Sequence, residues 1–325
     1  SRGLEFGAWC FPLFPFFFHL FLFSFPFGEG WGGTLFPQTP APPQTKNILL
    51  MNGIAHLGNG EVIENSAIGF EKGKLILVAD AKTIKIDRTK YDTIIHIEGK
   101  HVYPGFISVN STLGLTEIDE VRATRDFDDA GDINPHVRSE IAFNCESKII
   151  PTVRSNGVLL VQSTPRGGLI SGSSSVMELD GWNWEDAVYK KDDGIHLNWP
   201  VVFLHNTGFD EKTRLKMIEN EEEKIYQLKK FFEDAKAYSQ VQNNDEKNLR
   251  FEAMRGVFDG RQALFIHADF AKDIILSVNF ARDNGVKKIV IVGGYDSWHV
   301  TDMLKENKIP VIVRRIHDLP MREDE

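Results

Sequence analysis

Short apolar runs in the second half of the chain constrain its fold more than any other feature. Five such runs lie at 157–161, 200–204, 263–266, 288–292 and 309–313, the first of them just before the midpoint of the chain. Residues 272–284 and 297–307, between the last three runs, are each long enough for a helix. Uninterrupted apolar runs are typical of parallel strands buried on both faces, and their alternation with helices predicts βαβ units. The sequence therefore predicts an α/β fold with a parallel sheet.

A long charged segment at 210–242 has a different pattern. Its apolar residues recur near helical spacing: Leu215, Ile218, Ile225, Leu228, Phe232 and Ala235. Apolar residues at this spacing form one face of an amphipathic helix. We expect a surface helix or a pair of helices here, without a catalytic role.

Residues 46–99 read as a small β domain. Four short apolar strings, at 47–51, 66–70, 74–78 and 93–97, are separated by turns that contain Gly. Strings of this length with Gly turns between them predict a small antiparallel sheet.

Composition excludes some functions. The chain has 325 residues, a length that favours about two domains. Its net charge of −9 argues against a nucleic-acid binder, which would carry a basic surface. Its two cysteines, Cys10 and Cys145, form no CxxC and imply neither a disulfide framework nor a structural zinc site. We therefore expect no nucleic-acid partner.

The first 45 residues differ from the rest. Eleven of the 24 Phe lie between Phe6 and Phe36, and residues 9–27 are about as long as a membrane-spanning helix. Pro12, Pro15 and Pro26 oppose a regular helix. Two interpretations stay open, an export or membrane segment and a segment that is not native to the protein. The Pro-rich string at 37–44 then reads as a flexible or polyproline II linker.

Four motifs resemble one known family. They are HVYPGFISVNST at 101–112, TPRGGLISGSSSVMELDGW at 164–182, FIHAD at 265–269 and IVIVGGYDSW at 289–298. Together with the β domain before them, they resemble the amidohydrolase superfamily, and most closely its imidazolonepropionase-like branch, over about residues 46–325.

The resemblance implies a partial (β/α)8 TIM-like barrel preceded by a small β-sandwich domain. We expect a leader or non-native segment with a linker at 1–45, an incomplete sandwich at 46–103, and a barrel at 104–325 that is truncated at its C-terminal end. Relatives in this branch are often exported bacterial proteins, so a periplasmic or extracellular location is expected, with the cytoplasm as the alternative. No membrane partner is expected for the mature domain, and the oligomeric state is left open.

The implied activity is metal-assisted hydrolysis of a carbon–nitrogen bond other than a peptide bond, for example in a cyclic amide. Such a site would hold a divalent zinc, manganese or iron ion and act on a small-molecule substrate. However, Asn110 and Thr112 stand where the family has its first pair of His ligands, and Gly293–Gly294 stand where a further His is expected. A degenerate metal site is therefore expected. The alternative is a catalytically inactive barrel that binds a small ligand.

His267 in FIHAD matches a family metal ligand and is the candidate for that role here. Asp269 could orient its imidazole or belong to the next helix, and His317 could line the same mouth or a solvated loop. Asn110 and Thr112, expected on one side of a strand, could bind substrate or fill a buried polar layer. Arg166, in the Gly/Ser-rich segment 164–175, could pair with a substrate carboxylate in a loop that forms an anion nest, or belong to a surface loop.

Other candidate motifs are weak. The remaining histidines, His196 among them, are expected to be ordinary core or surface residues. The acidic run 126–132 lacks the EF-hand spacing and reads as a solvated loop. The sequence contains no HExxH, P-loop or GxSxG motif, so it does not point to a nucleotide site or a serine nucleophile.

Overall fold

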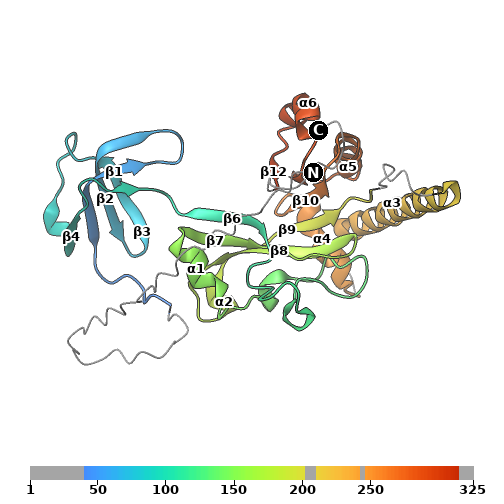
Figure 1. Cartoon of the computed structure of the whole chain (residues 1–325), viewed down its shortest axis with the longest axis horizontal. Helices are drawn as coiled ribbons and strands as arrows, with labels where there is room; N and C mark the ends of the chain where they lie inside the picture. The colour runs from blue at the N-terminus through green and yellow to red at the C-terminus, as the bar shows by residue number, and fades with distance from the viewer. Residues whose placement is uncertain (1–39, 202–209, 242–245, 315–325) are drawn as a thin grey trace, which may run out of the picture. The chain divides into compact units, whose positions relative to one another are not determined.

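A computed structural model describes residues 40–201, 210–241 and 246–314. These residues form two separate β-sheets, one of five strands and one of seven, with helices that follow the strands of the larger sheet (Figure 1). The expected α/β class, with a partial TIM-like barrel and a β domain, is confirmed. The leader segment and His317 lie outside the described residues.

The smaller sheet has the strand order β3-β2-β1-β4, and β5 also pairs with β1. Its strands are β1 (Ile48–His56), β2 (Val62–Glu71), β3 (Lys74–Asp80), β4 (Thr93–His96) and β5 (His101–Val102). The β1–β2 and β2–β3 pairs are antiparallel as expected. The expectation of an entirely antiparallel sheet is wrong, because β4 and β5 both run parallel to β1. The connection from β3 to β4 is a crossover that contains the 3-10 turn η1 (Arg88–Lys90), and a parallel pair requires such a crossover.

The larger sheet has the order β12-β11-β10-β9-β8-β7-β6. Its strands are β6 (Phe106–Ser111), β7 (Val158–Ser163), β8 (Ile170–Glu178), β9 (Val188–Asn198), β10 (Ala263–Ala268), β11 (Ile289–Gly293) and β12 (Val311–Val313). Neighbouring strands pair in parallel except around β8, which is antiparallel to both β7 and β9. All strands other than β8 therefore run in one direction and end at the same edge of the sheet.

Two expectations about strands are wrong. The apolar run at 200–204 is not a strand at its described positions, 200 and 201, because the strand before it, β9, has already ended at Asn198. The Gly/Ser-rich segment is a loop only as far as Leu169 and then continues as β8. Its serines are buried, and their hydroxyl groups are satisfied by remote partners: Ser173 donates to Asp192 and Ser175 to Glu140. Residues 170–175 are therefore sheet rather than an anion nest.

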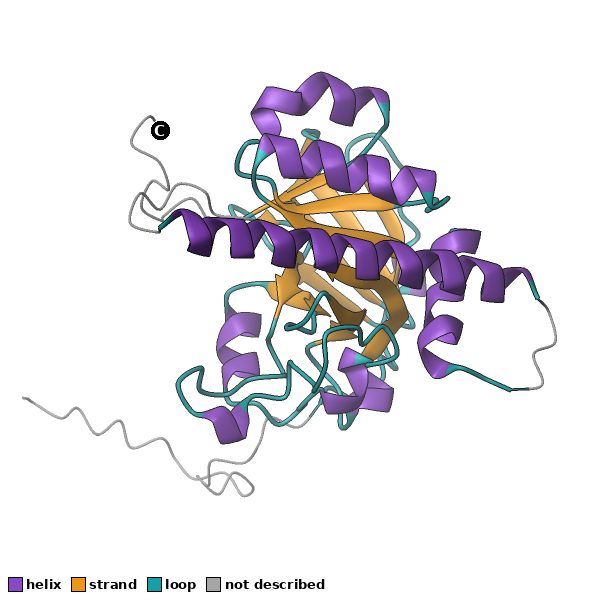
Figure 2. Ribbon diagram, turned by 90° about the vertical axis from the view of Figure 1, so that its right-hand side faces the viewer, coloured by secondary structure: helices purple, strands orange, loops and turns teal. Residues whose placement is uncertain are grey.

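The helices cover the larger sheet. They are α1 (Ile149–Ser155), α2 (Trp184–Ala187), α3 (Glu211–Gln240), α4 (Leu249–Asp259), α5 (Ala271–Asp283) and α6 (Thr301–Glu306), with short 3-10 turns η2 (Arg122–Thr124), η3 (Ser139–Ala142) and η4 (Ser297–Val300). Figure 2 shows α3 running across one face of the sheet. The helix expected at 210–242 is thus confirmed as α3. No described helix is long and apolar enough to cross a membrane.

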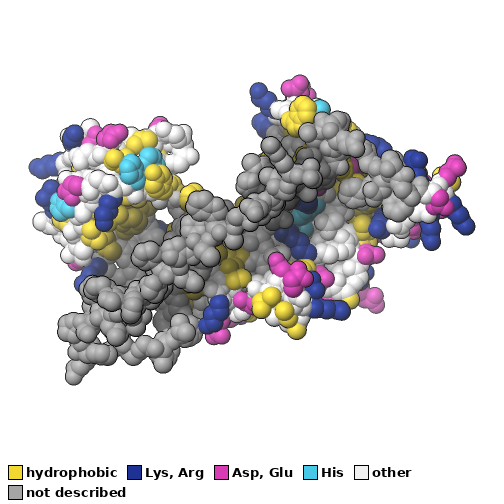
Figure 3. All heavy atoms as spheres, viewed as in Figure 1, with side chains coloured by type: hydrophobic (Ala, Val, Ile, Leu, Met, Phe, Trp, Pro, Cys, Tyr) yellow, Lys and Arg dark blue, Asp and Glu magenta, His cyan; other side chains and the backbone are white. Residues whose placement is uncertain are grey.

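The main core lies between these helices and the middle strands of the larger sheet. This core includes three residues of α3, Leu228, Phe232 and Ala235, which pack with buried residues of β9 and β10. The rest of α3 is largely exposed. Figure 3 shows basic and acidic side chains side by side at the right of the view, over the end of α3 that extends beyond the sheet. This division between the two faces is the one that the apolar spacing predicts.

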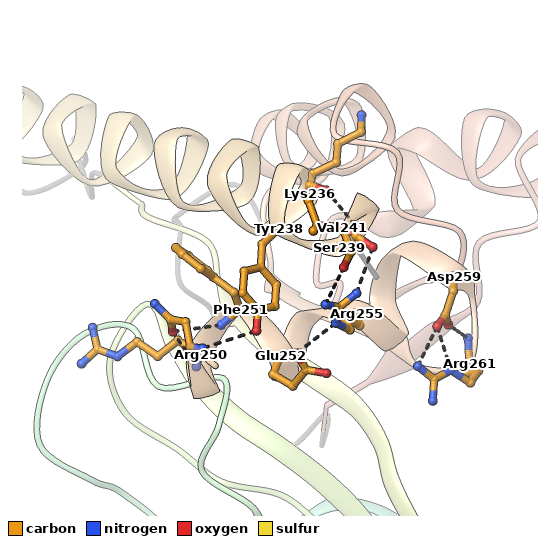
Figure 4. A network of polar contacts seen from close by, with 11 residues as sticks. Lys236, Tyr238, Ser239, Val241, Arg250, Phe251, Glu252, Arg255, Asp259 and Arg261 are labelled. Atoms are coloured by element: carbon orange, nitrogen blue, oxygen red, sulfur yellow. Dashed lines mark hydrogen bonds and ion pairs between the residues drawn. The ribbon is translucent and has the colours of Figure 1, made fainter. Parts of the chain in front are cut away.

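Arg255 of α4 fastens α4 to the C-terminal end of α3 (Figure 4). Its guanidinium donates to the backbone oxygens of Ser239 and Val241, at 3.0 Å in both cases, and lies over the Tyr238 ring at 4.8 Å from the ring centre. It thereby satisfies carbonyl groups at the helix end that lack a partner within the helix. The Arg255 side chain therefore links α4 directly to α3.

Candidate functional site

The parallel strands of the larger sheet place several polar side chains at their carboxyl ends, the edge where barrel enzymes have their active sites. We call this group the strand-end site. It consists of Asn110, Arg166, His196, His267, Asp269 and Arg314.

Two neighbouring strands bring His196 and His267 together. His196 lies on β9 and His267 near the end of β10, and their Nδ1 and Nε2 atoms are 2.9 Å apart. His196 is fully buried, and its ring stacks on Phe265 at 4.7 Å between ring centres. One imidazole donates and the other accepts, which requires that at least one nitrogen of the pair carries no proton.

Burial keeps both imidazoles uncharged. It lowers the pKa of His267 to about 3, with the positive charges of Arg166 and Arg314 as further causes. The pKa of His196 is also well below its usual value, because of burial first and then the proximity of His267 and Arg166. At neutral pH the pair therefore offers nitrogen lone pairs and N–H groups but no charge.

Arg166 is held in place by Asn110. Its Nη1 donates to the side-chain oxygen of Asn110 at 2.7 Å, and its Nη2 donates to the Asn110 backbone oxygen at 2.8 Å. Asn110 has a φ of +52°, in the left-handed region, and its backbone N–H donates to Gln162 Oε1 at 3.0 Å. Two of the predicted site residues are thus in direct contact.

The left-handed conformation at Asn110 also changes the end of β6. The pairing register with β7 shifts between Ser108 and Ser111. The regular alternation that would put Asn110 and Thr112 on one side of the strand is therefore broken, and that expectation is wrong. Thr112 follows the strand and is half-buried.

Asp269 is bonded to Arg314, which follows β12, with 3.2 Å between Oδ2 and Nη1. The carboxylate lies beside Gly293, at the end of β11, where a Cβ would overlap Asp269 Oδ1. Gly293 has a φ of +100°, which side chains rarely adopt. A His therefore cannot occupy position 293 without moving the backbone and Asp269.

The described residues do not fit the metal centre that the resemblance implies. Within residues 40–201, 210–241 and 246–314, no group of three or more His, Cys, Asp or Glu could hold a metal ion. The His196–His267 pair supplies two nitrogens, whereas a catalytic zinc takes about three protein ligands. The Arg166 cation near both rings opposes a second cation. A metal-binding role for His267 stays a prediction.

Sequence reasoning missed His196. The stretch 194–198 forms the end of β9, but the apolar pattern predicts a strand only at the next run, 200–204. Recognising His196 would have required the knowledge that β9 pairs with β10, in a register that puts His196 opposite Phe265. Local spacing contains no such information.

Comparisons with known proteins identify the fold. No model of a known protein family matches the chain, and no curated protein matches it in sequence. Its structure is similar to that of an amidohydrolase from Thermotoga maritima MSB8, with a TM-score of 0.71 and 21% identity over 85% of this chain and 72% of that chain. The chain therefore shares the fold of an amidohydrolase. The narrower resemblance to the imidazolonepropionase-like branch stays a prediction.

The uncharged histidines make the stability of the fold depend on pH. In the unfolded chain His267 is protonated below about pH 6.5, whereas in the folded chain it stays neutral down to about pH 3. The unfolded state thus binds more protons between these values, and the folded state loses stability as the pH falls through this window. From pH 7 to pH 5 we expect His267 alone to lower the free energy of unfolding by about 2 kcal/mol.

Urea unfolding at the two pH values measures this loss, with His267→Gln as the comparison. The variant should lose about 2 kcal/mol less than the parent over the same interval. His196 contributes in the same direction in both proteins. An identical pH dependence in parent and variant would show that His267 is not held neutral.

Proposed function

We propose that the chain binds a small molecule at the strand-end site and does not carry out the metal-dependent hydrolysis that the resemblance implies. The bond between Arg166 and Asn110 supports this most. Asn110 stands at the position of the family's first metal ligand, and it binds a guanidinium group instead. A fixed cation at that position and a divalent metal would repel each other.

The location of the site also supports ligand binding. Its members lie at or just after the carboxyl ends of several different strands, at the edge of the sheet where barrel proteins bind their ligands. His196 Nε2 is buried without a hydrogen-bond partner among the described residues, a costly state for a polar atom. A bound molecule with a complementary polar atom would remove that cost.

Hydrolysis of a carbon–nitrogen bond other than a peptide bond is the second candidate function. The shared fold with the amidohydrolase from Thermotoga maritima favours it. Fold alone does not define activity, and a metal centre would need more ligands than the two imidazole nitrogens of the described site.

Metal analysis combined with binding and activity assays separates the two candidates. The purified chain is analysed for zinc, manganese and iron, then incubated with a panel of cyclic amides and N-acyl amino acids. We expect a panel compound to bind and raise the Tm without being turned over. We also expect a metal content far below the value of about one ion per chain that a mononuclear site requires.

His267→Ala tests the site, and His56→Ala, at an exposed His pair of the smaller sheet, is the matched control. The first variant should lose the rise in Tm and the second should keep it. About one metal ion per chain that His267→Ala loses, together with turnover of a panel compound, would instead establish the hydrolase.

A further inference from the structure

Arg166 has an unusual environment for a cation. It is half-buried, and its two hydrogen-bond acceptors, the side-chain and backbone oxygens of Asn110, are both neutral. No described carboxylate forms an ion pair with it. Burial and the neighbouring charge of Arg314 lower its pKa, so its surroundings oppose the charge that it carries. Partly buried charges in proteins are normally paired, whereas Arg166 has no carboxylate partner among the described residues.

The guanidinium is also fixed in orientation. Two of its nitrogens bind the same residue, and that residue is itself held by Gln162, whose Nε2 donates to Asp193 Oδ2 at 2.9 Å. The backbone of Arg166 is anchored as well, because its N–H donates to the Phe127 oxygen at 2.6 Å. A guanidinium plane held in this way retains further N–H groups that can donate to an oxyanion without much loss of side-chain freedom.

The groups around Arg166 favour an anion over a cation. His196 and His267 are uncharged and close enough for Arg166 to lower their pKa values. Arg314 adds a second positive charge, which Asp269 only partly offsets because their contact is 3.2 Å long and Arg314 is exposed. Two guanidinium groups and the N–H groups of two uncharged imidazoles therefore lie close together at this edge. The acidic run 126–132 is also near, since Asp128 lies beside Gly167, but none of its carboxylates forms an ion pair with Arg166 among the described residues.

We propose that the Arg166 guanidinium, fixed by Asn110, is the positively charged group of the strand-end site and binds the carboxylate of a small-molecule ligand. The inference rests on the proposed function in that both use this site, and it adds the chemical class of the ligand. In this arrangement the guanidinium takes the place of the metal charge that the family fold would hold. The ligand carboxylate supplies the counter-ion that Arg166 lacks.

Two probes of matched size test the carboxylate. N-acetylglycine carries the charge, N-acetylglycinamide does not, and both are titrated into the 325-residue chain at low ionic strength by calorimetry. We expect N-acetylglycine to bind roughly 10- to 100-fold more tightly than the amide. Inorganic phosphate is the third probe, and tighter binding of phosphate than of N-acetylglycine would overturn the assignment to a carboxylate.

Two substitutions locate the effect. Arg166→Met keeps much of the side-chain volume but removes the charge, and should abolish the preference for the acid. Asn110→Asp leaves Arg166 in place and gives it a protein carboxylate, so it should weaken N-acetylglycine binding roughly tenfold even if Arg166→Met fails to fold. Arg261→Met is the control, because Arg261 is 74% exposed and pairs with Asp259.

The outcomes separate this inference from the proposed function. Equal affinity for acid and amide, with binding of either lost in His267→Ala, would overturn the carboxylate assignment and leave a ligand site at the strand ends. Acid binding that persists unchanged in both Arg166→Met and Asn110→Asp would overturn the role of Arg166. A lack of any binding to the two probes and to the amide panel would overturn both proposals.

Discussion

Replacement of Phe232 by Ala is expected to lower the free energy of unfolding by about 3–5 kcal/mol. Phe232 is fully buried on the inner face of α3. Its ring meets those of Phe280 and Phe258 edge-on, at 5.0 and 6.3 Å between ring centres. The substitution removes the packing of the whole ring and leaves a cavity between α3 and the sheet, and the neighbouring side chains are too tightly packed to fill it.

Phe231→Ala is the matched control, since it removes the same side chain from the adjacent position. Phe231 is only partly buried and packs mainly against Phe251, at 5.5 Å. Its loss should cost clearly less, about 1–2 kcal/mol. Chemical denaturation monitored by circular dichroism measures both variants. Equal losses would mean that α3 does not present the face that its apolar spacing predicts.

Gly293→Ala is expected to have the second largest effect, a loss of roughly 2–4 kcal/mol of stability. The backbone at Gly293, with a φ of +100°, is strained for any residue with a Cβ. The new methyl group would also overlap Asp269 Oδ1, so the carboxylate must leave its position beside Arg314. Both costs arise at the position where the family resemblance led us to expect a His ligand.

Gly157→Ala separates backbone strain from the overlap with Asp269. Gly157 has a similar φ of +88°, but a Cβ there would make only an ordinary contact with Phe106, at 3.5 Å. Thermal and urea unfolding should show a cost for Gly157→Ala about 1–2 kcal/mol smaller than for Gly293→Ala. If both variants lose the same amount, the crowding at Asp269 contributes nothing and position 293 could accept larger residues.

Strands and helices with strong local patterns could be predicted from the sequence. β10, β11 and β12 are short apolar runs, and α3 has apolar residues at helical spacing, so each is recognisable without its neighbours. β8 is different. Its Gly and Ser residues are typical of a loop, and they form a strand because Asp192 and Glu140 bind their hydroxyl groups and β7 and β9 bind their backbone.

The candidate site could be predicted only in part. Asn110, Arg166 and His267 were identified one by one, through the family motifs that contain them. His196 was not, because no motif and no paired ligand marks it. Asp269 was identified, but its contact with Arg314 was not expected.

The sequence by itself determined that the chain builds an α/β sheet of mainly parallel strands. It also determined that Asn110, Thr112 and Gly293–Gly294 lack the side chains of the metal ligands that the family resemblance implies. These properties depend on residue identity and local spacing. The tertiary structure decided that Arg166 binds Asn110 and that His196 meets His267, pairs that lie 56 and 71 positions apart in the chain. Such contacts depend on strand order and register, which long-range backbone pairing fixes and local spacing does not encode.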